Sequence, residues 1–498
     1  MRSITRTGLA AAALAAVVPQ AGAQAPALMT AVDSARAVCA GRARSEALVS
    51  AALARAKDVS ALNAFITLDE QGALAAAKRT DAAPKSARCK PLAGVPVVVK
   101  DNIEVAGLPA TAGTPALEDF VPKRDAPVAR RLRDAGAIVI AKTHMHELAF
   151  GISGWNPAFR SGPEPGVRNA YDPTRSAGGS SSGTAAALGA RVVSAGLGTD
   201  TGGSVRIPCA FNGCAALRPT AGRYPQGGIA PISRTRDTAG PMALAMADVE
   251  LLDRVITGAA AVQPASLKGV RLGRVKELLA NMDADTQAVF DAAIAKLVAA
   301  GVTVVDVEMP QLMELNGAVG FPVALYEAYD DMVAYLKKSG AGIGIAELAR
   351  QIASPDVKGT YEGLVIPRKL PGPNNTVVDA KPAYEAAMKT ARPALQKLYR
   401  DTFRRHRLDA LVFPTVPKVA MPASPDSSSV PVFMGVIQNT DPGSNAGVPG
   451  LQIPAGLGAS SQLPVGIELD GPAGSDRRLV AIGLAIEATL GRLPAPAR

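Results

Sequence analysis

The chain alternates between stretches with helical spacing of apolar residues and short, continuous apolar runs. Residues 94–100 (GVPVVVK) form one such run of β-branched residues and predict a buried strand that ends at Lys100. A helical pattern that starts at Pro127 leads through a glycine into an apolar run, and the helix predicted at 285–300 leads in the same way into a strand at 302–307. Later strands are predicted at 410–413, 451–453 and 465–469. This alternation predicts an α/β protein whose sheet is covered by helices on both faces.

Two further segments are predicted to be helical. Residues 29–57 are Ala-rich and predict a leading helix, and residues 325–405 predict a helical insertion that covers one end of the sheet and the site there. No Pro/Ser-rich linker, low-complexity tract or block of charge divides the chain. The usual domain size of about 150 residues would suggest three domains. Because no boundary is visible, we expect residues 24–498 to form one large domain.

The first 23 residues have the organisation of a secretory signal peptide. Arg2 and Arg6 precede an apolar run from Gly8 to Val18, and Ala21-Gly22-Ala23 follows as a small-residue cleavage site. The apolar run is shorter than the roughly 20 residues that a membrane-spanning helix needs, although an uncleaved membrane anchor is the alternative. We expect residues 1–23 to be removed and the mature protein to be periplasmic or secreted, without attachment to the membrane.

The formal net charge of +10 does not point to a nucleic-acid-binding protein. The basic residues are dispersed, and the short cluster Arg404-Arg405-His406-Arg407 has no aromatic residues between its charges. A solvated surface explains such a cluster better than a nucleic-acid site does. We expect a small-molecule partner, no nucleic acid, and a monomer or homodimer.

Four cysteines follow the predicted cleavage site. The export signal implies a compartment in which disulfides persist, and we expect Cys39 and Cys89, which both precede the predicted core, to be bridged. Cys209 and Cys214 lie in an apolar stretch, and we expect them to be thiols that simply pack in the core. A Cys-x4-Cys pair without a neighbouring histidine is a poor zinc motif, so no metal site is predicted.

Candidate chemistry is concentrated in residues 176–206, which are rich in Gly and Ser. A flexible linker does not account for this segment, because residues 184–193 have the Ala and Leu content of a helix. We interpret the segment as two Gly-rich loops, one on each side of that helix. The hydroxyls of Ser180 to Ser182 are predicted to cap the N-terminus of the helix. The loop from Asp200 to Ser204 is predicted to turn consecutive N–H groups toward a ligand, as an oxyanion hole requires.

A serine nucleophile needs a base, and the sequence offers few. His144 and His146 follow a predicted strand, where structural hydrogen bonds are the better interpretation, and His406 lies in a basic helix at the surface. Lys100 is the remaining candidate, because burial at the end of an apolar strand lowers the pKa of a lysine. A salt bridge with Asp101 or another acid is the alternative explanation of this lysine.

Together these residues resemble the amidase signature family. The similarity rests on Gly178-Gly179-Ser180-Ser181, on the stretch from Asp200 to Arg206 (DTGGSVR) and on Lys100-Asp101-Asn102 upstream. It implies a single large α/β/α domain with a central mixed, twisted sheet. It also implies a Ser-Ser-Lys triad, in which Ser204 forms the acyl-enzyme, Ser180 on a cis peptide bridges, and Lys100 is the base.

The resemblance implies further roles. The N–H groups of Thr201, Gly202, Gly203 and Ser204 would form the oxyanion hole, and Ala149 would line the substrate pocket. No metal or organic cofactor is implied. The residues that would brace the loops without reacting are Ser181, Thr199, Asp200 and Arg206.

Residues 223–241 and 439–450 look most like the branch of the family that contains the indoleacetamide and mandelamide hydrolases. A small, aryl-substituted primary amide, cleaved to the acid and ammonia, is therefore the expected substrate. A peptide amidase or an aryl acylamidase of the same family is the alternative. A subunit that acts on charged tRNA is disfavoured, because the chain carries an export signal and lacks a basic stripe.

Two other classes of protein are compatible with parts of this sequence. Ser181 also fits the Gly-x-Ser-x-Gly elbow of α/β-hydrolases, but that motif needs a preceding strand, and residues 169–177 are polar and turn-like. An exported binding protein that has lost turnover is the non-enzymatic alternative. The intact Lys100, Ser180 and Ser204 argue against it.

Overall fold

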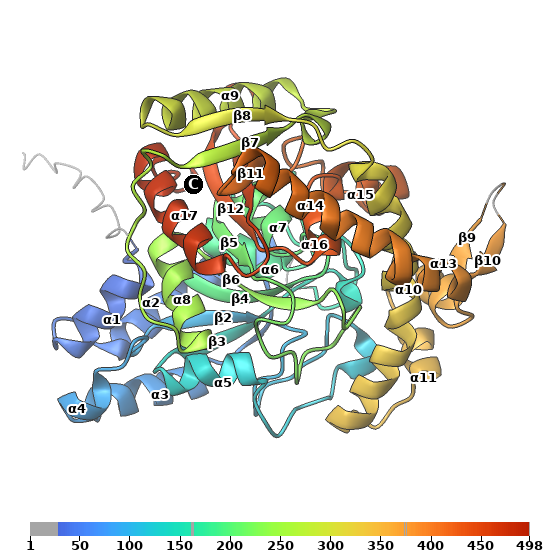
Figure 1. Cartoon of the computed structure of the whole chain (residues 1–498). Helices are drawn as coiled ribbons and strands as arrows, with labels where there is room; N and C mark the ends of the chain where they lie inside the picture. The colour runs from blue at the N-terminus through green and yellow to red at the C-terminus, as the bar shows by residue number, and fades with distance from the viewer. Residues whose placement is uncertain (1–27, 161–163, 373, 375, 498) are drawn as a thin grey trace, which may run out of the picture.

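A mixed sheet of eleven strands runs through the computed structural model, which describes residues 28–160, 164–372, 374 and 376–497 (Figure 1). In order across the sheet the strands are β1 (Phe65–Leu68), β3 (Ile138–Thr143), β2 (Pro96–Lys100), β4 (Ala195–Asp200), β6 (Thr238–Ala243), β5 (Ala215–Arg218), β12 (Gly450–Leu457), β13 (Pro464–Asp470), β11 (Ala410–Pro414), β7 (Arg271–Val275) and β8 (Thr303–Val307). Strand β2 is parallel to β3 and β4, and β7 is parallel to β8 and β11. The remaining neighbours are antiparallel. The predicted signal peptide, residues 1–23, lies outside the described residues.

Strand β2 shows why the sequence has a continuous apolar run here. Val97 and Val99 face one hydrophobic core, whereas Val98 between them faces the core on the opposite side of the sheet. A strand that is buried on both faces favours apolar residues at successive positions, and β2 has them from Pro96 to Val99, before Lys100 ends it. The predicted mixed sheet between helical layers is therefore confirmed.

Helices cover both faces of the sheet (Figure 1). One face carries α1 (Ala31–Cys39), α5 (Pro127–Asp134), α8 (Met246–Thr257), α9 (Ala284–Ala299) and α17 (Asp476–Leu490). The other face carries α2 (Ser45–Asp58), α3 (Glu70–Ala82), α6 (Ser182–Gly189), α7 (Arg206–Asn212) and α14 (Arg392–His406). The short helices α4 (Lys85–Arg88), α15 (Val430–Ile437) and α16 (Asp441–Ala446) lie in the connections.

The single leading helix predicted for residues 29–57 is wrong, because the segment forms two helices. Helix α1 ends before Gly41, whose φ of +71° is a left-handed conformation that favours glycine. Helix α2 then starts at Ser45, where the carboxylate of Asp81 accepts the N–H groups of Ser45 and Glu46 at 2.7 and 3.0 Å. The break thus depends on a residue of α3 that is distant in the sequence.

The helical layer at one end of the sheet differs in extent from the predicted insertion at 325–405. It begins at Leu312, the first residue of α10 (Leu312–Ser339), and it includes a small hairpin. Its other elements are α11 (Ile345–Gln351), α12 (Pro355–Thr360), β9 (Lys369–Pro371), β10 (Val377–Asp379) and α13 (Ala380–Ala386). Helix α14 completes the layer and returns the chain to the sheet at β11 (Figure 1).

Two disulfides are present among the described residues. One joins Cys39 to Cys89. The other joins Cys209 to Cys214, so the prediction that these two cysteines are thiols was wrong, although both are fully buried in the core. Gly213 ends α7 with a φ of +68° and turns the chain back, and the N–H of Cys214 donates to the carbonyl of Cys209 at 3.0 Å. This turn brings the two sulfur atoms together.

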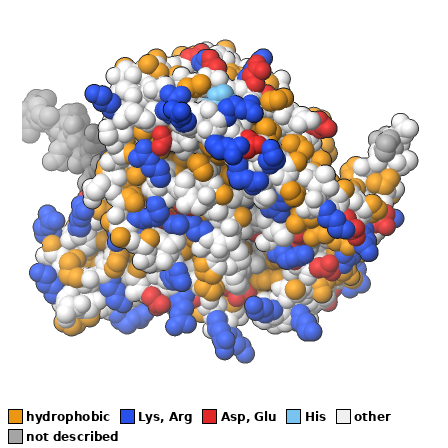
Figure 2. Space-filling view, viewed as in Figure 1, with side chains coloured by type: hydrophobic (Ala, Val, Ile, Leu, Met, Phe, Trp, Pro, Cys, Tyr) orange, Lys and Arg blue, Asp and Glu red, His pale blue; other side chains and the backbone are white. Residues whose placement is uncertain are grey.

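The surface carries its positive charge in a dispersed form. Figure 2 shows Lys and Arg side chains spread across the visible face, with Asp and Glu side chains among them. Within the described part of the chain, no helix combines the length and the apolar character that a membrane span needs.

Candidate active site

Lys100 ends β2 and lies fully buried between two polar side chains. It follows Val98 by two positions, so its side chain leaves the sheet on the same face, toward α6. The Nζ atom lies 2.7 Å from Ser180 Oγ and 2.7 Å from Thr199 Oγ1. The neighbours of this amine are therefore hydroxyl groups.

The surroundings favour the uncharged form of Lys100. Burial lowers the pKa of Lys100 to about 7, and the carboxylates of Asp200 and Asp237 oppose this only in part. The alternative that Lys100 forms a salt bridge with Asp101 is wrong, because Asp101 pairs instead with the buried Lys142, whose Nζ lies 3.2 Å from Asp101 Oδ1. Near neutral pH a substantial fraction of Lys100 is a free amine.

Ser180 lies in the turn that leads into α6, after a cis peptide bond between Gly179 and Ser180. Its carbonyl accepts the N–H of His146 at 3.2 Å. The hydroxyl of the next residue, Ser181, does not cap α6 as predicted. It donates to the carbonyl of Thr199 at 3.1 Å and accepts the N–H of Thr199 at 3.2 Å, which ties the turn to β4.

Ser204 lies in the loop between β4 and α7, at the wall of a cavity. Its carbonyl accepts the N–H of Ser181 at 3.1 Å, so the two Gly-rich loops are adjacent through their main chains. Ser204 as a residue is only 7 % exposed. Among the hydrogen bonds of the described residues, Lys100 is linked to Ser180, and none links the hydroxyls of Ser180 and Ser204.

The predicted oxyanion hole needs one correction. The N–H of Gly203 donates to Asp200 Oδ1 at 2.8 Å, and Gly203 is absent from the lining of the cavity, whereas Thr201, Gly202 and Ser204 line it. The carbonyl of Gly202, which belongs to the same peptide unit as the N–H of Gly203, is also held in place, because it accepts a hydrogen bond from the hydroxyl of Thr440 at 2.6 Å. The N–H groups that remain for a ligand are therefore those of Thr201, Gly202 and Ser204.

Asp200 organises the loop that carries Ser204. Burial alone would raise the pKa of Asp200, but the guanidinium groups of Arg206 and Arg218 hold it well below its usual range. The ionised carboxylate accepts the N–H of Gly203 at 2.8 Å and that of Val205 at 3.2 Å, one on each side of Ser204. Asp200 and Arg206 thus brace the loop.

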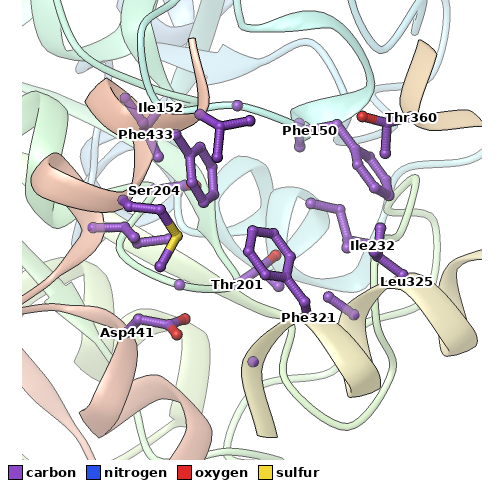
Figure 3. Close-up of a pocket in the computed structure, with 18 of the residues that line it drawn as sticks. Phe150, Ile152, Thr201, Ser204, Ile232, Phe321, Leu325, Thr360, Phe433 and Asp441 are labelled. Atoms are coloured by element: carbon purple, nitrogen blue, oxygen red, sulfur yellow. The ribbon is translucent and has the colours of Figure 1, made fainter. Parts of the chain in front are cut away.

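A largely apolar cavity of about 320 Å³ opens beside Ser204. Figure 3 shows aromatic and aliphatic side chains that face one another across it, while Ser204, Thr201 and Asp441 lie along one side. The apolar lining consists of Ala149, Phe150, Ile152, Ile232, Met313, Phe321, Ala324, Leu325, Val430, Phe433, Met434 and Ile437. Ala149, which the family resemblance placed at the pocket, belongs to this lining.

Sequence reasoning missed most of this wall. The α10 contributors Met313, Gly317 and Phe321 recur at helical spacing, and this face of the helix was a usable signal. No local signal identified the four contributors from α15, because this helix is apolar on every side. Asp441 lies in residues 439–450, whose likeness to one branch of the family does not by itself identify a residue of the cavity.

The three histidines have different surroundings. His144 is fully buried between the carbonyls of Met145 and Ala158, and burial lowers its pKa. His146 lines the cavity, and its Nε2 lies 3.0 Å from Asp356 Oδ2 of α12. His406 lies at the C-terminal end of α14 and is not part of the cavity lining. The hydrogen bonds of His144 and His146 agree with the structural role predicted for them.

Comparison with known proteins identifies the family. The family model described as Amidase matches residues 47–480. The chain belongs to the amidase family. It is 46% identical over 458 residues to a mandelamide hydrolase of Pseudomonas putida, a match that covers 92% of this chain and 90% of that protein. It is 41% identical over 448 residues to an indoleacetamide hydrolase of Agrobacterium vitis, covering 88% and 92% of the two chains.

The fold of this chain is also similar to that of a solved amidase. The X-ray structure of native peptide amidase from Stenotrophomonas maltophilia superposes with a TM-score of 0.79 at 30% identity, over 94% of this chain and 98% of that chain. Because the family model and these named amide hydrolases match most of the chain, the protein is an amidase, that is, a hydrolase that acts on amide C–N bonds.

Proposed function

We propose that this amidase is exported and hydrolyses a small, aryl-substituted primary amide to the acid and ammonia through an acyl-enzyme on Ser204. The main support for the catalytic part of this proposal is the position of the buried Lys100 amine, whose Nζ lies 2.7 Å from Ser180 Oγ. Ser180 itself lies in a turn that is hydrogen-bonded to the loop of Ser204. A free amine in this place is a base. Among the described residues, Lys100 is the titratable group whose side chain is hydrogen-bonded to Ser180 Oγ.

The proposed reaction moves protons along this line of residues. Neutral Lys100 accepts the proton of Ser180 while Ser180 accepts that of Ser204, and Ser204 Oγ forms a bond to the amide carbon. The N–H groups of Thr201, Gly202 and Ser204 stabilise the resulting oxyanion. The protons return through Ser180 to the amide nitrogen, the C–N bond breaks, and ammonia leaves. Water then attacks the ester, with its proton following the same route, and the carboxylic acid is released.

The cavity supports an aryl substituent on the acyl side. Its volume of about 320 Å³ is at the small end of ligand sites, which suits one or two rings better than a long peptide. Phe321 and Phe433 have stacked rings 5.9 Å apart and both line the cavity, so an aromatic substrate meets aromatic walls. The relatives named for mandelamide and indoleacetamide act on amides with aromatic acyl groups. A peptide amide is the competing substrate, because a peptide amidase shares the fold.

The export part of the proposal rests on residues 1–23 and on the cysteines. Disulfides persist in oxidising compartments, and the four cysteines after the predicted cleavage site form two disulfides. These bonds favour a periplasmic or secreted protein over a cytoplasmic one.

The substrate is tested by measuring the release of ammonia or aniline from a panel. Phenylacetamide, mandelamide and indoleacetamide are expected to give kcat/KM at least about 10-fold above acetamide, because burial of one ring supplies more than 1.4 kcal/mol. A peptide amide and a nitroanilide are expected to be poorer than the three aryl amides. A peptide amide that exceeds all three would replace the aryl assignment with the peptide amidase.

The nucleophile is tested by trapping with a fluorophosphonate and locating the adduct by peptide mass spectrometry. We expect the label on Ser204, and we expect Ser204→Ala to lose the label and at least about 10⁴-fold in kcat. Ser182→Ala is the matched control, because Ser182 is a buried hydroxyl in the same segment whose Oγ makes no hydrogen bond. Labelling of Ser181 or of no serine would contradict the acyl-enzyme on Ser204.

The base is tested by the dependence of kcat/KM on pH. Only the uncharged amine accepts a proton, so kcat/KM is expected to be lost as pH falls through the Lys100 pKa of about 7, and to decrease tenfold per unit below it. Asp237→Asn is expected to move this limb to lower pH, because the Asp237 charge opposes the lowering of the Lys100 pKa. A profile that stays flat down to pH 5 would exclude a lysine base.

Export is tested by expressing the full chain in a Gram-negative host and sequencing the N-terminus of the protein in each fraction. The periplasmic protein is expected to begin at Gln24. Full-length protein that remains in the cytoplasm, with its cysteines reduced, would refute the signal peptide. An otherwise identical chain without residues 1–23 serves as the control.

A further inference from the structure

A network of five charged side chains is buried beneath the loop that carries Ser204. Its members are Asp200, Arg206, Arg218, Glu468 and Asp470, each at most 1 % exposed. On β13, Ile467 and Leu469 face the core on one side of the sheet, so Glu468 and Asp470 project from the opposite side, toward α7. The mechanism proposed above uses none of the β13 residues.

Arg206 joins the two halves of this network. Its Nε and Nη2 donate to the two carboxylate oxygens of Asp200, each at 3.1 Å. Its Nη1 donates to Glu468 Oε1. On the other side, Arg218 Nη1 donates to Asp200 Oδ1 at 2.9 Å. Arg206 therefore links Glu468 to Asp200 by hydrogen bonds.

Two carboxyl oxygens in the network have no partner. Glu468 Oε2 and Asp470 Oδ1 are both buried and unpaired in the structure. They belong to residues two apart on one strand, whose side chains leave the same face. A methyl group at Gly450 would lie 2.9 Å from Glu468 Oε1 and 3.1 Å from Asp470 Oδ1, which places the two carboxyl groups around one point. Both unpaired oxygens thus belong to adjoining carboxyl groups.

The charges of the network do not balance when all groups are ionised. Within these five side chains, three carboxylates and two guanidinium groups sum to one net negative charge in a fully buried site, which is unfavourable. The guanidinium groups of Arg236 and Arg392 lie on the side of Arg218. One bound proton removes the net negative charge of the five side chains. Two adjoining buried carboxyl groups cannot both ionise at low cost, and a proton shared between them would supply a hydrogen bond to oxygens that otherwise have no partner.

We propose that Glu468 and Asp470 share one proton, and that this protonated pair is a positioning element that keeps Arg206 on Asp200 and so holds the loop of Ser204 in place. The inference concerns the same site as the proposed function and rests on it for the role of Ser204. Burial raises the pKa of both carboxyl groups, in agreement with a retained proton.

The surroundings of the pair determine what loss of the proton does. The charged and titratable groups that face it are Arg206 of α7, Arg218 of β5, Asp200 of β4 and Tyr399 of α14, whose hydroxyl donates to Asp470 Oδ2 at 3.3 Å. Deprotonation adds a negative charge on the β13 side of Arg206 only. Arg206 is then attracted away from Asp200, which holds the Gly203 and Val205 N–H groups on either side of Ser204. Activity is expected to fall at alkaline pH.

The proton is tested by infrared spectroscopy of the whole protein between pH 6 and 8. We expect one component of the carboxylic acid C=O absorption of the wild type to be absent from both Glu468→Gln and Asp470→Asn. Asp248→Asn is the matched control, because Asp248 is a buried carboxyl with a pKa raised to about 7 by burial, and it accepts N–H groups of α1 on the face of the sheet opposite to this network. Removal of Asp248 is expected to leave the band of the pair unchanged. Spectra of the wild type and both pair variants that superimpose in this region would overturn the proposal.

The positioning role is tested by the pH profile of the same variants. Glu468→Gln keeps an acceptor for Arg206 and offers Asp470 an N–H in place of the shared proton, so we expect kcat/KM within about threefold of wild type at pH 7.5 and no alkaline decrease. Glu468→Leu cannot hold Arg206 and is expected to lose about 10- to 100-fold in kcat with little change in KM. Should Glu468→Gln not fold, Asp470→Asn supports the same two measurements.

These readouts separate the two proposals. An alkaline decrease that persists in Glu468→Gln overturns the positioning role, even if Ser204 is labelled. An infrared band that depends on Glu468 and Asp470, together with labelling of a residue other than Ser204, retains the shared proton and rejects the proposed nucleophile.

Discussion

The burial of an amine whose hydrogen-bond partners are two hydroxyl groups is the constraint on which this site depends. Lys100 leaves the end of a strand that is covered on both faces, so water is excluded from it. Burial lowers its pKa to about 7, and hydroxyl groups of Ser180 and Thr199 occupy the positions where an acid would restore the charge. A salt-bridged lysine in the same place would be a structural residue.

The nearby acids are kept occupied by other cations. Asp101, next to Lys100 in the sequence, pairs with Lys142, and Asp200 pairs with Arg206 and Arg218. These ion pairs have two effects. They reduce the negative potential at Lys100, and they keep Asp200 ionised, so that its carboxylate accepts the N–H groups on either side of Ser204. The electrostatics of the base and the conformation of the nucleophile loop are therefore coupled through one carboxylate.

The site is divided between two parts of the fold. The sheet and its adjoining turns, from β2, β4 and α6, supply the groups proposed to react, whereas α10 and α15 supply much of the apolar wall (Figure 3). Substitutions in the wall change the shape of the cavity without touching Lys100 or Ser180. Relatives that share the fold but are named for different amides are consistent with this separation.

Local patterns in the sequence were sufficient for six strands of the sheet (β2, β3, β8, β11, β12 and β13), for Lys100 at the end of one of them and for the two Gly-rich loops, because each depends on residues that are neighbours in the chain. They did not identify β1, β4, β5, β6 and β7. The resemblance to a family added the assignment of Ser180 and Ser204. Contacts between distant residues decided the rest: Asp81 accepts the first N–H groups of α2, and the hydroxyl of Thr440 holds the carbonyl of Gly202 in the loop of Ser204. The cavity wall likewise required α10 and α15 to meet around Ser204. The spacing of residues along a chain indicates which face of a helix or strand each residue occupies, but it does not indicate which distant group will contact that face. The protonation of Lys100 and of the Glu468–Asp470 pair depends on such distant contacts.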